Sequence, residues 1–208
     1  MGLDRKYQCI PATSGLIEWA RRDEALRECG EWFGSVPSWL WPDASLAPGG
    51  PPEPGELALW HRVRALREQA PGLAQRCCHL DRRWDKLHYV LSAHRRGEPC
   101  SETDALLDAA VDGELLIAEH LCSGQGVPVR YTPAERVTEI ARVLAPMTWA
   151  SLERHCIPER MEAAKVYKFF ADRADAQEWA WLREAFEHFR AFYLLAAEHG
   201  DTVLVYTY

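Results

Sequence analysis

Apolar residues recur at helical spacing through most of the chain. The clearest case predicts a helix over 176–199, with Gly200 as its stop. Its apolar stripe comprises Trp179, Leu182, Phe186, Phe189, Tyr193 and Ala197. The same spacing predicts further helices over 15–29, 56–70, 80–95, 102–110, 133–145 and 149–156. The chain is therefore expected to be mainly helical.

Polar residues that favour helix N-caps stand immediately before several of these segments. The predicted caps are Thr13 or Ser14, Ser101, Thr132 and Thr148. Ser101 and Thr132 are each followed by an acidic residue three positions later, as in a capping box. Gly30 is predicted to end the first helix, since glycine is the common residue after a helix C-terminus.

Both ends of the chain predict β-strands. KYQCIP, residues 6–11, ends at a proline, and TVLVYTY, residues 202–208, is rich in β-branched and aromatic side chains. A lone two-stranded ribbon is marginal in water, so these strands must pack on helices or gain further strands. We therefore predict an α+β fold, mainly helical, with a small β-sheet in which the N-terminal and C-terminal strands pair with each other.

Residues 34–55, GSVPSWLWPDASLAPGGPPEPG, interrupt the helical pattern. Their proline and glycine content predicts a loop or insertion, within a single domain that spans 1–208, rather than regular helix or central strand. A long loop with aromatic anchors is typical of a binding surface, so Trp39 and Trp41 are predicted to contact a protein partner. The alternative is that both tryptophans pin the loop to the core.

Charge and composition narrow the class of protein. The net charge of −7 argues against a nucleic-acid partner. The chain has no apolar run of membrane-spanning length and no signal-peptide pattern, so we expect a cytoplasmic protein without a membrane partner. The seven cysteines are expected to be reduced. Without a C-x-x-C pair or an H-E-x-x-H sequence, neither a metal nor a cofactor is predicted.

Lysine is scarce. Four of the 24 basic residues are lysine, at positions 6, 86, 165 and 168, and the other twenty are arginine. This skew indicates a GC-rich bacterial genome.

The stretch DRRWDKLHYVLSAH, residues 81–94, carries the candidate catalytic residues. On a helix, Asp81, Asp85, His88 and Ser92 share one edge beside an apolar stripe. An aspartate one turn before a histidine can orient the imidazole, so Asp85 and His88 are the catalytic candidates and Asp81 is a candidate ligand contact. The alternative is a structural histidine at the rim of the core that hydrogen-bonds its neighbour.

The loop 124–131 carries the candidate ligand-binding residues Gly126, Arg130 and Tyr131. Gly126 frees the backbone, and Arg130 offers a bidentate donor for a carboxylate or phosphate. The helix that follows adds free backbone N–H groups. We therefore predict that a small anion binds here, in a cleft shared with His88. The alternative is that Arg130 pairs with a structural carboxylate while Tyr131 packs in the core.

Several short patterns occur in an order that is similar to one bacterial family. They are Met1-Gly2, RRWDKLH with Trp84, Leu87 and His88, then Gly113, GQGVPVRYTPAERV with Gly126, Pro128, Arg130 and Tyr131, and FYLLAAEHGDTVLVYTY. On these residues the chain resembles the YfbM-like proteins over nearly its whole length, most weakly over 30–70. The family often has Tyr-Pro where this chain has Tyr167-Lys168, and a tyrosine in the loop that reads GQGVP here. The resemblance implies a compact α+β fold and no particular activity.

Two functional hypotheses follow. The favoured one is an intracellular protein-binding module without catalysis, which uses the loop with Trp39 and Trp41, since no recognisable catalytic motif is present. The alternative is a small-molecule or anion-binding enzyme that uses Asp85, His88 and Arg130. The sequence leaves the status of the chain as an enzyme undecided, with the balance against catalysis.

Overall fold

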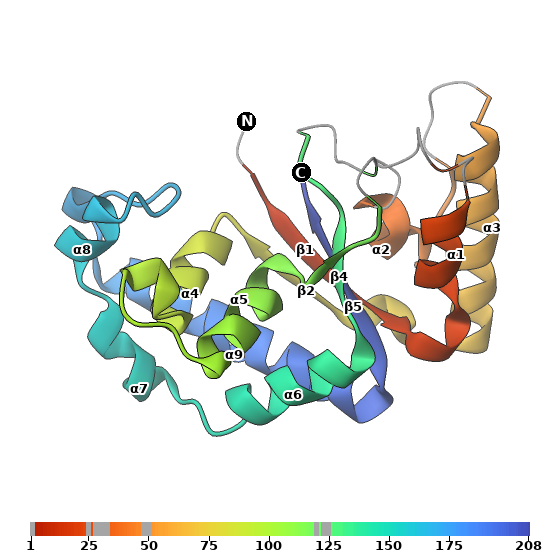
Figure 1. The fold of residues 1–208 in the computed structure, drawn as a ribbon. Coiled ribbons are helices and arrows are strands. Elements are labelled where there is room, and N and C mark those ends of the chain that lie inside the picture. The colour runs from red at the N-terminus through yellow and green to blue at the C-terminus, as the bar shows by residue number, and fades with distance from the viewer. Residues whose placement is uncertain (1–2, 24–25, 27–33, 47–50, 119–120, 122–125) are drawn as a thin grey trace.

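The computed structural model describes residues 3–23, 26, 34–46, 51–118, 121 and 126–208. At its centre lies a five-stranded antiparallel sheet with the strand order β2-β1-β5-β4-β3 (Figure 1). The strands are β1 (Arg5–Pro11), β2 (Cys77–Asp81), β3 (Leu115–Leu116), β4 (Arg130–Thr132) and β5 (Asp201–Thr207). The two terminal strands pair from Arg5 opposite Thr207 to Pro11 opposite Asp201. The predicted α+β fold and the pairing of the terminal strands are confirmed.

Helices cover both faces of the sheet. Figure 1 shows α1, α2 and α3 on one side and α4, α5, α6 and α9 on the other. The helices are α1 (Leu16–Arg22), α2 (Val36–Trp39), α3 (Pro54–Gln69), α4 (Trp84–Leu91), α5 (Glu102–Asp112), α6 (Ala134–Leu144), α7 (Trp149–Leu152), α8 (Pro158–Ala163) and α9 (Ala176–His199). Every residue of β5 is buried, as expected for a strand covered on both faces. In the part of the chain that is described, no helix is long and apolar enough to cross a membrane.

Local sequence signals fix several helix ends as predicted. Ser101 and Thr148 each form a reciprocal capping box at the first turns of α5 and α7. Gly200 ends α9 in the left-handed conformation, with φ at 65°. These capping residues satisfy the unpaired backbone groups at the ends of their helices. The sequence is therefore sufficient to locate these helix ends.

The predicted helix over 80–95 is in fact a strand followed by a shorter helix. β2 takes the residues up to Asp81, and α4 begins at Trp84. Ser92, directly after α4, is extended, with φ at −102° and ψ at 126°. The hydrogen-bonded ladder with β1 outweighs the local helical pattern. As a result Asp81 leaves the helical edge that carries His88.

The first predicted helix is shorter than 15–29. α1 begins at Leu16, after Gly15 in the left-handed conformation, and ends at Arg22 because Asp23 is extended, with φ at −83° and ψ at 108°. Gly30, the predicted stop, lies outside the described residues. An extended residue cannot continue the ladder of helical hydrogen bonds, so Asp23 ends the helix before the glycine.

Residues 34–55 are not a loop throughout, because α2 lies inside them and α3 starts at Pro54. Both helices place a proline in the first turn, where its missing N–H costs no helical hydrogen bond. The predicted cap Thr132 lies in β4 instead, and its hydroxyl donates to the Ala109 carbonyl oxygen at 3.3 Å. α6 therefore begins one residue later than predicted, at Ala134.

The core on one face of the sheet closes over the C-terminal end of α5. Tyr7 packs edge-on against Phe189, with ring centroids 5.3 Å apart, and Phe189 packs against Tyr193 at 5.0 Å. The Tyr7 hydroxyl donates to Val111 O (2.8 Å), and the Tyr193 hydroxyl donates to Ala110 O (2.7 Å). A helix leaves its last four carbonyls unpaired, so these buried hydroxyls satisfy two of them. Burial raises the pKa of both phenols, which remain neutral donors.

Candidate functional site

His88 lies on α4 and faces two carboxylates of α5. Its Nε2 is 2.7 Å from Asp108 Oδ1, and its Nδ1 is 3.8 Å from Asp112 Oδ2. The imidazole is 5% exposed, whereas the side chains of Asp108 and Asp112 are 28% and 45% exposed. His88 is therefore a rim histidine whose nitrogens face polar neighbours, and any acid–base chemistry here would pair it with Asp108.

Asp85, the predicted partner of His88, is engaged elsewhere. Its Oδ1 accepts from Arg95 Nη2 (2.5 Å), and its Oδ2 accepts from the backbone N–H of Tyr167 (2.7 Å). The predicted pairing of Asp85 with His88 is therefore wrong. The physical reason is burial: every residue from Asp85 to Leu91 is buried, so each side of α4 meets a different neighbouring element.

Asp81, the third acidic candidate of this stretch, lies at the surface. It ends β2 with φ at 47°, and its side chain is 59% exposed, with Oδ2 3.8 Å from Arg83 Nη2. The orientation of the Asp81 side chain is set by its position at the end of β2, since the residue does not belong to α4. Asp81 is thereby separated from the buried contacts of Asp85 and His88.

Arg130 starts β4 and binds the backbone beyond the end of α5. Its Nε donates to Gly113 O (2.9 Å), and its Nη2 donates to Glu114 O (2.8 Å). Gly113 has φ at 77°, and a Cβ there would stand 2.7 Å from the Arg130 Cβ, so only glycine permits this approach. Among the described residues, the partners of the guanidinium are these carbonyls, whereas the alternative prediction paired it with a carboxylate. Tyr131 is buried, and its hydroxyl accepts from Arg21 Nη1 (3.2 Å).

A pocket of about 340 Å³ adjoins Arg130 over the ends of three strands. Its other lining residues are Arg5, Asp112, Val127, Pro128, Val205 and Thr207. Arg5 is itself satisfied, because it donates to Asp112 Oδ1 (2.5 Å) and to Thr207 Oγ1 (3.1 Å). His88 is not among the lining residues. Asp112 lines this pocket and lies 3.8 Å from His88 Nδ1, so the pocket at Arg130 is near His88 but is not the predicted cleft shared with it.

Gly126, the remaining candidate of that loop, precedes the pocket without lining it. Its φ is 72°, and a Cβ built there meets no atom within 4 Å. The residue serves the turn through its backbone conformation alone.

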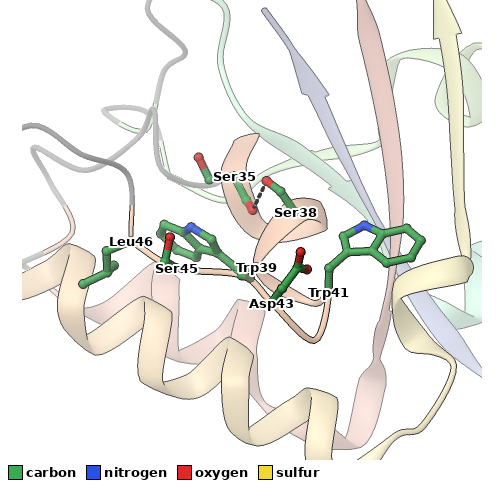
Figure 2. Close-up of a pocket in the computed structure, with 8 residues that line it drawn as sticks. Ser35, Ser38, Trp39, Trp41, Asp43, Ser45 and Leu46 are labelled. Atoms are coloured by element: carbon green, nitrogen blue, oxygen red, sulfur yellow. Dashed lines mark hydrogen bonds between the residues drawn. The ribbon is translucent and has the colours of Figure 1, made fainter.

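The tryptophan segment forms a second pocket, of about 450 Å³, beside α2 and the turn that follows it (Figure 2). It is lined by Ser35, Ser38, Trp39, Trp41, Asp43, Ala44, Ser45 and Leu46. Trp39 is 2% exposed and belongs to the core, whereas Trp41 is 45% exposed. Figure 2 shows the Trp41 indole pointing away from Trp39. The two predicted anchors therefore have different positions, and only Trp41 offers a surface.

Two arginines of α3 hold this turn. Arg67 Nη1 donates to Trp41 O (2.8 Å) and to Pro42 O (2.9 Å), and Arg64 Nη1 donates to Ala44 O (3.2 Å). The carbonyls on both sides of the turn are thus bound to one helix. Trp41 is consequently presented on a fixed backbone.

The cysteines and the possible metal ligands are further groups that could carry chemistry. No three His, Cys, Asp or Glu side chains in these ranges are placed to hold a metal ion. The described cysteines are free thiols at Cys9, Cys77, Cys78, Cys100 and Cys156. Burial raises the pKa of Cys78 and of Cys156 to about 12, which keeps both sulfurs protonated and weakly nucleophilic at neutral pH.

A third pocket, of about 310 Å³, lies where the residues between α8 and α9 meet the start of α4. No pattern in the sequence predicted it. Two of the chain's four lysines, Lys86 and Lys168, line it, and Lys165 lies three residues before the second. The scarcity of lysine was the one available signal. The sequence could not show that positions 86 and 168 are neighbours in space.

The fold and these sites define an α+β protein with pockets between its helices and over the ends of its strands. Residues 53–206 match the model of a family described as "Domain of unknown function (DUF1877)", and the chain belongs to this family. It is similar to a solved structure described as a protein of unknown function, YfbM from Escherichia coli, with a TM-score of 0.55 and 16% identity over 99% of each chain. No curated protein matches. The predicted resemblance to YfbM-like proteins is confirmed.

At 16% identity the likeness to YfbM shows the fold alone. The family match covers residues 53–206, so the pocket at Lys168 lies inside it, and the pocket at Arg130 does so except for Arg5 and Thr207. Trp39 and Trp41 lie before it. The tryptophan surface therefore lies outside the part of the chain that the family model matches.

Proposed function

We propose that the chain is a protein-binding module and that Trp41 is the centre of its contact surface. One observation carries this proposal: Trp41 is 45% exposed on a turn whose carbonyls are held by Arg64 and Arg67. A large side chain on a fixed backbone loses little conformational freedom when it binds. Tryptophan is also enriched among the residues that dominate binding energy at protein interfaces.

The side chains that line the pocket indicate which kind of partner would bind there. Asp43 is the only charged residue among the eight described residues that line it, and three of the others are serines. An acidic group beside an exposed indole favours a partner that brings an apolar side chain together with a lysine or arginine. We infer that such a segment places its apolar side chain on Trp41 and its cation on Asp43.

A cytoplasmic location belongs to the same proposal. The five described cysteines are all free thiols, which fits a reducing compartment. The partner would then be another protein of that compartment.

Selection of displayed random peptides on the wild-type protein tests the proposal. We expect enrichment of peptides that place an aromatic or aliphatic residue next to lysine or arginine. Trp41→Ala should weaken their binding by at least about tenfold, because the central aromatic contact is lost. Trp181→Ala is a matched control, since Trp181 is 49% exposed on α9. The proposal fails if the wild type enriches no common pattern, or if both tryptophan variants bind alike.

The alternative function, an enzyme that uses Asp85, His88 and Arg130, has weaker support. Asp85 is paired with Arg95, and two donors of Arg130 are bound to backbone carbonyls. These contacts draw both groups away from a substrate. Its chemical core would have to be His88 with Asp108, which lie 2.7 Å apart.

A further inference from the structure

The pocket between α8 and α9 gathers positive charge on an acidic protein. Its lining includes four cations, Arg82, Lys86, Lys168 and Arg173, and one carboxylate, Glu178. The surplus is three positive charges, although the whole chain carries a net charge of −7. Arg82 precedes α4, Lys86 lies in its first turn, and Lys168 and Arg173 lie between α8 and α9, so the fold assembles the cations from distant positions.

These cations differ in how far they are neutralised. Lys86 Nζ lies 2.5 Å from Glu178 Oε1 in a largely buried pair. Arg82 Nε is 3.8 Å from Asp4 Oδ1, with the Arg82 side chain 59% exposed. For Lys168 and Arg173, the described residues supply no salt bridge within 4.0 Å. Two cations thus remain available to an anion.

The side chains of Lys168 and Arg173 each lie over an aromatic ring. Lys168 Nζ is 5.9 Å from the centroid of the Tyr167 ring, and Arg173 Cζ is 5.1 Å from the centroid of Phe170. Cation–π contacts at exposed positions are weak compared with a charge-assisted hydrogen bond to a phosphate or carboxylate. An anion would therefore gain direct contacts without breaking a salt bridge of Lys168 or Arg173.

The backbone that carries Lys168 is held in an unusual conformation. Lys165 and Lys168 have φ values of 55° and 53°, in the left-handed region that non-glycine residues rarely adopt. Tyr167, which lies between the two lysines, anchors this segment. Its N–H donates to Asp85 Oδ2 (2.7 Å), and its hydroxyl accepts from Leu3 N (2.7 Å). Strain of this kind persists where surrounding contacts fix it, and it is concentrated at functional sites.

The pocket also has a flat apolar wall. Phe169 is 6% exposed and packs against Trp179 at 6.0 Å between ring centroids, whereas the neighbouring Phe170 is 50% exposed. An exposed ring beside surplus positive charge suits a molecule with both an anionic group and a planar ring. A volume of about 310 Å³ falls in the range of small-molecule sites.

We propose that this pocket binds a phosphorylated small molecule that carries a planar ring, the chemistry of a nucleoside diphosphate. Lys168 and Arg173 bind the phosphates, with Arg82 at the rim, and Phe170 stacks on the ring. Lys86 and Glu178 form the fixed floor. Asp85 acts at a distance, as a positioning residue that holds Tyr167 and with it the segment of Lys168. This proposal is independent of the peptide surface at Trp41.

Calorimetric titration with ADP and, separately, with inorganic pyrophosphate tests the proposal. The double variant Lys168→Asn/Arg173→Gln removes the two charges, and asparagine tolerates the left-handed backbone at position 168. We expect this variant to weaken ADP binding by at least about tenfold. Lys165→Asn is the matched control, because Lys165 has the same backbone conformation and does not line the pocket. The control should keep the wild-type affinity.

The two probes separate the phosphate from the ring. ADP should bind about tenfold more tightly than pyrophosphate, and Phe170→Ala should abolish that preference while leaving pyrophosphate binding unchanged. Absence of ADP binding at millimolar concentration would overturn the proposal, and so would equal affinities of the double variant and the Lys165 control. Equal binding of ADP and pyrophosphate would overturn the part assigned to Phe170. A short single-stranded oligonucleotide that displaces ADP at much lower concentration would overturn the small-molecule assignment.

Discussion

Two cationic regions of this molecule use their positive charges differently. At the C-terminal end of α5, Arg5 donates to the Val111 carbonyl (3.0 Å) and Arg130 donates to those of Gly113 and Glu114. In the pocket before α9, Lys168 and Arg173 have rings as neighbours instead, and within the described ranges they form no salt bridge. We call the first the closed region, because its arginines are bound within the chain, and the second the open pocket, because Lys168 and Arg173 are available to a ligand.

The difference shows why an arginine near a glycine-rich loop is a poor guide to an anion site. A helix C-terminus has unpaired carbonyls and the negative end of the helix dipole, so it attracts cations of its own chain. Arg5 binds one of these carbonyls, and Arg130 binds the two carbonyls that follow the helix. A functional cation is better recognised by the lack of such an acceptor, which only the folded structure reveals.

Removal of Arg5 is expected to have the largest effect and would test whether the first region is structural. The side chain is 9% exposed, pairs with Asp112, and lies 3.8 Å over the Trp84 ring. We expect Arg5→Met to lower the free energy of unfolding in urea by about 3 kcal/mol, because buried charge-assisted hydrogen bonds are lost. Arg82→Met, at a 59% exposed position, should change it by less than about 0.5 kcal/mol. Equal losses in both variants would contradict the comparison.

Asp85→Asn tests the link between α4 and the open pocket. The neutral amide must turn an NH₂ group toward either Arg95 or the Tyr167 N–H, so we expect a loss of about 2 kcal/mol in urea unfolding. ADP binding should weaken as well, although no charge of the pocket is removed. Asp81→Asn is the control, because that carboxylate is 59% exposed. If Asp85→Asn is destabilised but binds ADP normally, its positioning role is wrong.

Arg130→Gln should separate stability from binding. Its two hydrogen bonds to carbonyls predict a loss of about 1.5 kcal/mol in the free energy of unfolding, and ADP affinity should not change. Arg136→Gln is a suitable comparison, since Arg136 is 41% exposed and pairs with the half-buried Glu114 and the exposed Glu139. A marked loss of ADP binding in Arg130→Gln would move the anion site back to the position that the sequence indicated.

Acid should act on the first turn of α5, at the end of the helix opposite to the closed region, with the smallest effect of the series. Burial raises the pKa of the Asp104 carboxyl, but hydrogen bonds from Ser101 and the Ala93 N–H outweigh it, and the pKa lies below its ordinary value of 3.8. A carboxyl with a depressed pKa in the folded state contributes stability above its unfolded pKa and loses it as the pH falls through the folded value. Asp104→Asn should cost about 1 kcal/mol at pH 7 and progressively less below about pH 4, measured by urea unfolding. A cost that is the same at pH 7 and pH 3 would rule out this role.

Much of the fold could be predicted because its signals are local. The stripe of α9, the Ser101 and Thr148 caps and the β-branched terminal strand each lie within a few residues of the element that they define. The strand β2 could not be predicted in the same way, because a five-residue segment next to a helical pattern takes its state from the ladder with β1.

The sites were harder to predict because their partners are distant in sequence. Asp85 and His88 looked like a pair at helical spacing, yet Asp85 pairs with Tyr167 and His88 with Asp108. The Lys86–Glu178 pair spans 92 positions. Which charges are neutralised follows from tertiary contacts of this kind, so the sequence identified cations without showing which of them are available.

The most direct test of the central claim is a titration of ADP into Arg130→Gln and into Lys168→Asn under the same conditions. The account predicts that Arg130→Gln keeps the affinity of the wild type despite its lower stability. Lys168→Asn should lose affinity by about tenfold while its stability is unchanged or slightly higher, because asparagine suits the left-handed backbone. The reverse pattern, with binding lost in Arg130→Gln and kept in Lys168→Asn, would contradict the claim that the anion binds in the open pocket and not at Arg130.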